Sequence, residues 1–203
     1  MSGLREQQKE MRKQAISQAA VALFASQGYQ DTTIEQIARE AGVSVPTVFK
    51  YFGSKQEIVL EMLNQEDPSS LSETCERMLD FADPLDALCH LEQMLIDHAL
   101  KELPASIWRE VLPAILSGGS NTFSERYREM NERLLAEISG LLRKLQAAGK
   151  LRADLDVELA AYLLNDYSHL QLLRLTSQET MDMEAHRYHV RRTSGLVLRG
   201  MLA

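Results

Sequence analysis

The sequence predicts an all-α protein with a small N-terminal three-helix domain and a larger C-terminal helical bundle. Ala, Leu, Glu, Gln and Arg dominate the 203 residues, and the apolar positions recur with helical spacing. The sequence has no sustained alternation of apolar and polar residues rich in Val, Ile and Thr, which would indicate strands. With 45% hydrophobic and 25% charged residues, the composition is that of an ordinary globular protein.

The most informative stretch is residues 32–55, TTIEQIAREAGVSVPTVFKYFGSK, in which capping signals mark two short helices. Either Thr32 or Thr33 can cap the first helix, because a threonine hydroxyl accepts hydrogen bonds from otherwise unpaired backbone N–H groups. Glu35 or Gln36, three residues later, would complete a capping box. The first helix is therefore expected to begin at Thr33, within one residue.

The residues that follow predict a tight turn and two more helix starts. Gly42 can adopt a positive φ and end the helix, Ser44 can cap the next one, and Pro46 falls within its first turn. Residues 54–57, SKQE, form another capping box. Together with a supporting helix expected over 5–27, this arrangement predicts a helix-turn-helix, a motif that reads DNA.

The charge distribution bears on DNA binding. The net charge is −7, but residues 1–63 carry seven basic and seven acidic side chains, so the acidic excess lies in the rest of the chain. A neutral binding domain predicts modest, strongly salt-dependent affinity. The first helix begins with a basic cluster that would lie along a phosphate backbone or form a solvated face: Arg5, Lys9, Arg12 and Lys13.

Targeting and redox signals are weak. No apolar run has the length of a membrane span, and the N-terminal residues lack the apolar core of a signal peptide, so we expect a cytoplasmic protein without a membrane partner. Cys75 and Cys89 have no C-x-x-C partner, and we expect free, buried thiols. The sequence does not decide whether either has a redox role.

Catalytic and metal-binding motifs are missing from the sequence. A di-iron bundle needs Glu-x-x-His pairs, and none occurs, nor does G-x-S-x-G or a glycine-rich phosphate loop. Asp166-x-x-His169 and His186-x-x-His189 are single pairs, which we interpret as structural or surface histidines. We therefore expect no enzymatic activity, no metal and no cofactor.

The supporting helix that ends in Gly28-Tyr29, followed by TTIEQIAREAGVS and PTVFKYFGSK, resembles the TetR family of bacterial transcription repressors over about residues 10–63. The resemblance implies a dimer that binds a palindromic operator, with the second helix of the motif in the major groove, and a variable helical domain that binds a small inducer. It also implies which residues contact DNA: Thr33 and Lys55 at phosphates, and Ser44, Val45, Pro46, Thr47, Phe49, Lys50 and Tyr51 on the recognition helix.

The sequence departs from the family pattern at two of these positions. The family usually has Tyr at the position of Phe49 and often His at that of Tyr51. Phe49 would meet a thymine methyl or pack in the core. Thr47 and Lys50 are the best candidates for base contact, because a hydroxyl and an ammonium group can reach base edges. We expect Thr47, Lys50, Tyr51 and DNA shape to carry most of the specificity.

Beyond residue 63, local signals define the helices. Asp-Pro pairs predict helix starts near 69 and 85, and further helices are expected over about 121–148, 157–176 and 180–201. Pro113 predicts either two short helices or one kinked helix. An effector pocket between these helices would be mostly apolar and suit an apolar or aromatic effector, and its candidate residues are Phe81, Met94, His98, Trp108, Phe123, Tyr127, Tyr162 and His169.

The last two helices carry more apolar surface than one buried face requires, which indicates a partner. In the family these helices pair with those of a second subunit into a four-helix interface. Gly195 would permit close approach there, or would merely weaken an ordinary helix. The candidate interface residues are Leu163, Tyr167, Leu170, Tyr188, Gly195, Leu196 and Leu198.

We thus expect a DNA-binding domain over 1–54 and an effector-binding and dimerisation domain over 55–203, with a helix at about 55–66 as connector. The favoured function is a ligand-responsive repressor that binds a palindromic operator as a homodimer. The alternatives are a transcriptional activator, a helical module that uses the motif to bind protein, and, less favoured, a small-molecule enzyme. The operator, the effector and the regulated genes are not encoded in recognisable motifs.

Overall fold

The computed structural model describes residues 2–63, 77–116 and 122–200. These residues form α-helices joined by turns, with one 3₁₀ turn at Met78–Asp80 and no strand among them, which confirms the all-α prediction. The chain divides into two compact units. The first comprises Met1–Gln65 with Glu102–Arg126, and the second comprises Glu66–Lys101 with Tyr127–Ala203.

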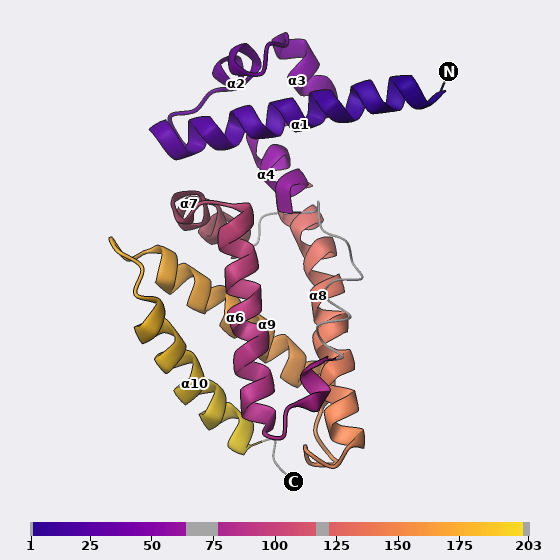
Figure 1. Ribbon diagram of the computed structural model, residues 1–203, viewed down its shortest axis with the longest axis vertical. Helices are drawn as coiled ribbons and strands as arrows, with labels where there is room; N and C mark the ends of the chain where they lie inside the picture. Colours follow the sequence, from indigo (N-terminus) through magenta and orange to yellow (C-terminus); the bar gives the residue numbers. More distant parts are fainter. Residues whose placement is uncertain (1, 64–76, 117–121, 201–203) are drawn as a thin grey trace. The chain divides into compact units, whose positions relative to one another are not determined.

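The first unit contains the helix-turn-helix. Its helices are α1 (Ser2–Gln27), α2 (Ile34–Glu40), α3 (Val45–Tyr51), α4 (Lys55–Leu63) and α7 (Ala105–Leu116). Helix α2 packs against both α1 and α3 (Figure 1), and the apolar residues that join the three helices are fully buried, among them Phe24, Ile37 and Val48. The core therefore fixes α3 in one orientation on its support.

The predicted caps of α2 and α3 are confirmed. The Thr33 hydroxyl accepts from the N–H of Gln36 at 3.2 Å, and the Gln36 side chain accepts from the N–H of Thr33 at 2.7 Å. Gly42 takes a φ of 65°, a conformation that costs glycine little, and it turns the chain toward α3. Ser44 caps α3, with Pro46 in its first turn.

The cap of α4 differs from the predicted box in one partner. The Ser54 hydroxyl accepts from the N–H of Glu57 at 3.2 Å, as expected, but the Glu57 carboxylate accepts from the N–H of Gly53 at 3.1 Å. Because Gly53 follows the end of α3, this bond ties the recognition helix to the first turn of α4.

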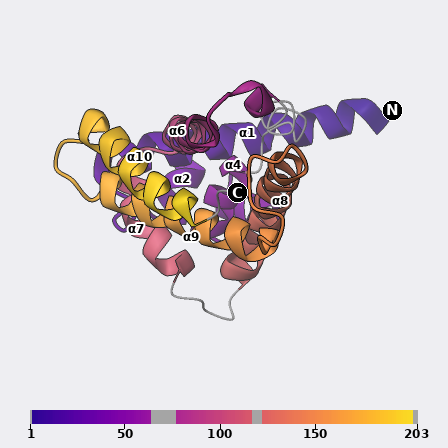
Figure 2. The same cartoon turned by 90° about the horizontal axis from the view of Figure 1, so that it is seen from below.

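The second unit is built from α6 (Pro84–Glu102), α8 (Thr122–Ala147), α9 (Val157–Thr176) and α10 (Met183–Arg199), of which α6 up to Lys101 and α8 from Tyr127 belong to it. Figure 2 shows α9 and α10 side by side. Asp83 and Asp156 cap their helices as predicted, and Asp182 caps α10, which therefore begins three residues later than expected. The core combines leucines of α6 and α8 with Val157, Ala160 and Ala161 of α9.

The region around Pro113 is a single helix, α7, with Pro113 exposed inside it. This result decides against two short helices. The predicted helix start near 69, the loop at Gly118-Gly119 and Cys75 lie outside the described residues. No helix in the described ranges has the length and apolarity required to cross a membrane.

Candidate nucleic-acid interface

Helix α3 presents one face to the core and the other to solvent. Val48 is fully buried and Phe52 is 2% exposed, so these two residues anchor the helix and its end. The predicted contact residues lie elsewhere on the helix and at its cap. Ser44, Pro46, Phe49 and Lys50 are exposed, and Val45, Thr47 and Tyr51 are half-buried.

Phe49 decides between two interpretations that the sequence left open. Its side chain is 53% exposed, so it is not a core residue. An aromatic ring held in water on a reading helix costs solvation free energy unless a partner covers it. Phe49 is therefore available for apolar contact with a DNA base.

The hydroxyl groups at the start of α3 are joined. Ser44 Oγ and Thr47 Oγ1 lie 2.7 Å apart, and Ser44 Oγ also accepts from the N–H of Thr47 at 3.3 Å. The Thr47 side chain is therefore held in place by the residue that caps α3.

Lys55 contacts its own unit. Its Nζ donates to the carbonyl oxygens of Tyr29 at 2.7 Å, Gln30 at 3.3 Å and Thr32 at 2.7 Å, and it lies 4.6 Å from the centre of the Tyr29 ring. An ammonium group has three hydrogens, so these contacts use its donors. Burial lowers the pKa of Lys55. The lysine thus fastens the α1–α2 connection to the start of α4, and its proposed phosphate contact stays a prediction.

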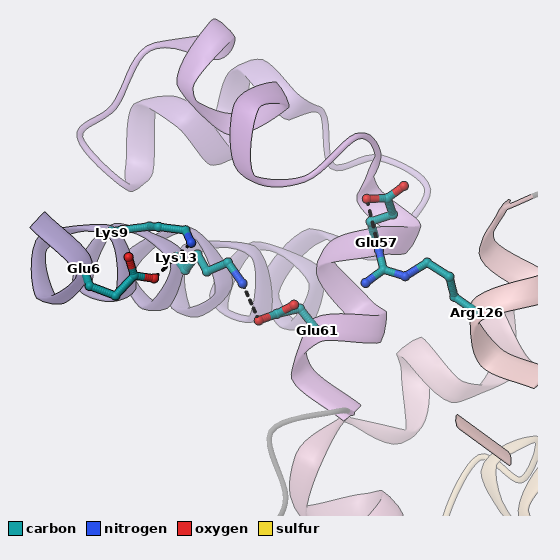
Figure 3. Close-up of polar contacts among 6 residues, drawn as sticks. All are labelled: Glu6, Lys9, Lys13, Glu57, Glu61 and Arg126. Atoms are coloured by element: carbon teal, nitrogen blue, oxygen red, sulfur yellow. Dashed lines mark hydrogen bonds and ion pairs between the residues drawn. The ribbon is translucent and has the colours of Figure 1, made fainter. Parts of the chain in front are cut away.

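Two lysines of the N-terminal basic cluster also pair within this unit (Figure 3). Lys13 on α1 contacts Glu61 on α4 at 2.8 Å, and Lys9 contacts Glu6 one turn away at 3.0 Å. The Lys13–Glu61 pair is largely shielded from solvent, so it joins α1 to α4. Lys9, in an exposed pair worth little, is more readily redirected to a phosphate than Lys13.

Two further residues support the motif but were not singled out in the sequence. Gln27 Nε2 donates to the carbonyl of Asp31 at 3.2 Å, to Thr32 Oγ1 at 3.2 Å and to Gln36 Oε1 at 2.9 Å. It thereby joins the end of α1 to the capping box of α2. Arg126, on the first turns of α8, contacts Glu57 at 3.3 Å (Figure 3). No local sequence pattern reports the contact between Arg126 and Glu57, which lie 69 positions apart.

The candidate effector residues are dispersed. Tyr127 and His169 come together in the second unit, with the Tyr127 hydroxyl 2.5 Å from His169 Nε2, while His169 Nδ1 donates to the carbonyl of Asn165 at 2.8 Å. Burial lowers the pKa of His169, so the ring is neutral and accepts from the tyrosine. This pair connects α8 to α9.

The other candidates do not join that pair. Trp108 is buried in the first unit, Tyr162 is 56% exposed on α9, and Phe81 lines a different cavity. Met94 and His98 are half-buried on α6, and the Phe123 side chain lies outside the described residues. In the part of the chain that the structure describes, no three His, Cys, Asp or Glu residues are arranged to hold a metal ion.

The apolar excess of the last two helices lies on their surface. The large exposed side chains are Leu159, Tyr162, Leu163 and Leu170 on α9 and Tyr188 and Leu196 on α10, and Tyr167 is half-buried. Two predicted interface residues face inward instead. Leu198 is buried in the core of its own unit, because the α10 turn that carries it packs on the bundle. A Cβ at Gly195 would lie 3.5 Å from Leu85, so its close approach is to α6.

Residues 16–62, which span the end of α1, the capped motif and α4, match the family model for bacterial regulatory proteins of the tetR family. The chain belongs to the TetR family. It is a transcriptional regulator. The transcriptional repressor NicS of Pseudomonas putida is 25% identical over 98% of this chain and 97% of its own length.

Other TetR regulators match over different lengths. The transcriptional regulator HbdR of Aromatoleum is 40% identical over 81 residues, which cover 40% of this chain but only 35% of HbdR. The structure of Thermus thermophilus FadR, a TetR-family repressor in complex with lauroyl-CoA, is 27% identical with a TM-score of 0.68 and covers 94% of this chain and 95% of FadR. The match to HbdR thus covers part of the chain, whereas the match to FadR covers nearly the complete fold.

Proposed function

We propose that this TetR-family regulator is a repressor that binds a palindromic operator as a homodimer and leaves it when an effector binds. The observation that carries the proposal is the exposed face of α3, on a helix anchored by Val48 and held at its start by Ser44. The names of NicS and FadR as repressors favour repression over activation.

In this proposal α3 lies in the major groove. Thr47, Lys50 and Tyr51 contact base edges, since hydroxyl and ammonium groups read donor and acceptor patterns there. Phe49 covers a thymine methyl, which accounts for an exposed aromatic ring on α3. The remaining assigned contacts are apolar ones from Val45 and Pro46, a contact from Ser44 at the start of the recognition helix, and phosphate contacts from Thr33 and Lys55.

A homodimer accounts for the exposed apolar residues of α9 and α10. Side chains such as Leu163, Tyr188 and Leu196 are each about half or more exposed in the single chain. A two-fold partner that presents the same surface would cover them. The two DNA-binding domains of the dimer would then contact half-sites one helical turn apart, roughly 34–36 Å.

The proposed effector is a small apolar or aromatic molecule. The FadR structure contains an acyl-CoA, a ligand with a long apolar chain. Such an effector must bind more tightly to the form in which the spacing of the two DNA-binding domains does not fit the operator. Only a difference in affinity between the two forms shifts the equilibrium between them. Contacts within the first unit connect α8 to the end of α3, because Arg126 of α8 contacts Glu57 and Glu57 accepts from the N–H of Gly53, which follows α3. These contacts provide a route by which effector binding affects the recognition helix.

Selection of bound fragments from the source genome tests the proposal and names the operator. We expect one recurring inverted repeat, retarded at low salt and released as salt rises. Thr47→Ala should lose preference at one position of each half-site. A protein that retards no DNA at low salt would instead be a protein-binding module. A selected sequence without two-fold symmetry would contradict the homodimer.

A further inference from the structure

A cavity of about 440 Å³ lies between α6 and α10 in the second unit. Its size is that of a small-molecule site. Of the predicted effector residues whose side chains the structure describes, only Phe81 lines it. The cavity is therefore a separate feature, and its lining is more polar than an apolar effector requires.

Three residues that line the cavity carry buried polar atoms without a hydrogen-bond partner among the described residues. Glu92 is 6% exposed; its Oε2 accepts from Ser168 of α9, whereas Oε1 has no hydrogen-bond partner among the described residues. Gln93 donates through Nε2 to Asp97 at 2.7 Å, but its Oε1 is buried and unsatisfied, as is Nε2 of His186. Such atoms in a native fold indicate water, an ion or a ligand.

The chemistry of these atoms is that of an acceptor site. The carbonyl oxygen of Gln93 can accept a hydrogen bond from a ligand but cannot donate one. The same is true of the free oxygen of Glu92 when its carboxyl group is ionised. Burial raises the pKa of Glu92 to about 7. A bound cation favours the ionised carboxylate and forms a charged hydrogen bond with it. Burial lowers the pKa of His186, which leaves the ring neutral at pH 7.

The outer rim of the cavity, in contrast, carries two arginine side chains, which are hydrogen-bond donors. Arg191 of α10 pairs with Asp86 of α6 at 2.7 Å and joins the two helices. Arg187 is exposed beside it and lines the same cavity. The apolar parts of the wall are Val190 and Phe81, whose ring is 5.3 Å from that of His90. A matching ligand has a cation at its inner end and an anion at its outer end.

We propose that this cavity binds a small zwitterion of the amino-acid type. Its ammonium group donates to Glu92 and Gln93, its carboxylate faces Arg187, and its side chain lies against Phe81 and Val190. The proposal goes beyond repression and does not depend on it, because it concerns a site formed entirely by the second unit.

Calorimetric titration of the full chain with each of the twenty protein amino acids, at about pH 8, tests the site without DNA. We expect at least one to bind, and its deaminated analogue to bind about ten- to a hundredfold more weakly, the loss of a charged hydrogen bond in a buried site. No heat from any of the twenty at millimolar concentration, or equal binding of the deaminated analogue, would overturn the proposal.

Two variants locate the binding groups. Glu92→Gln keeps the shape but removes the charge, and we expect a loss of at least about tenfold in affinity. Glu132→Gln, on the exposed face of α8, is the matched control and should bind like the native chain. Arg187→Ala, at an exposed position, should weaken binding without a change in circular dichroism, which keeps the test decisive if Glu92→Gln unfolds. Native affinity in both variants would refute the site.

The pH dependence gives a third readout. Affinity of the native chain should rise as the pH passes about 7, because Glu92 must lose its proton to receive the ammonium group. Glu92→Gln should lose most of this rise, and a profile identical to that of the native chain would contradict the role of Glu92. The other titratable or charged groups that face the cavity and its inner wall are Asp86, Cys89, His90, Tyr167, His186, Arg187 and Arg191.

Discussion

Replacing Lys55 by alanine separates a structural role from a role in DNA binding. The ammonium group donates to the three carbonyls of Tyr29, Gln30 and Thr32 and lies against the Tyr29 ring. A hydrogen bond from a charged donor contributes about 1.5–3 kcal/mol when buried. Because Lys55 is only half-buried and one bond is long, water would recover much of this. We expect Lys55→Ala to lower the free energy of unfolding by about 2 kcal/mol.

The assay is urea unfolding followed by circular dichroism, with Lys50→Ala as the matched control. Lys50 is exposed on α3, so its loss should leave the free energy of unfolding within about 0.5 kcal/mol of the native value. If the unfolding free energy of Lys55→Ala equals that of the native chain, the structural role of Lys55 is refuted.

Salt-titrated binding to the selected operator then addresses the phosphate. Each phosphate contact contributes about 0.9 to the slope of log affinity against log salt. If Lys55 also exchanges a carbonyl for a phosphate when DNA binds, Lys55→Ala lowers that slope by about one. An unchanged slope would remove Lys55 from the proposed contacts and leave it the purely structural role.

Three further predictions address other residues. Phe49→Ala should leave stability within about 0.5 kcal/mol, because the ring is exposed, but relax operator preference at a thymine position in a randomised selection; an unchanged preference would exclude a base contact. Leu163→Glu combined with Leu196→Glu should shift the chain from dimer to monomer in sedimentation, whereas Met11→Glu, equally exposed but on α1, should not. The pKa of Glu92 is raised by burial to about 7, so folding keeps a proton that the unfolded chain releases, and stability should fall by about 3 kcal/mol as the pH rises from about 4.5 to about 7. Glu92→Gln should lose this fall, and an equal fall in the variant would assign it to other groups.

Local signals placed most of the helices correctly. The cap at Thr33, the turn at Gly42 and the cap at Ser44 each depend on residues within four positions of one another, so sequence alone determines them. The same holds for Asp83 and Asp156. Helix α10 begins three residues later than its apolar pattern predicts, because Asp182 caps it.

The sequence by itself determined the all-α fold, the helix-turn-helix and the family, because helical periodicity, capping and turn chemistry act within one or two turns of chain. Only the tertiary structure decided what each exposed or charged side chain meets. It placed Phe49 in solvent, directed Lys55 to three backbone carbonyls, and buried Leu198 in its own core. It also buried Glu92 beside a cavity that no sequence motif predicts. These outcomes depend on contacts between residues far apart in the chain, and packing, not local spacing, determines which face of a helix is covered.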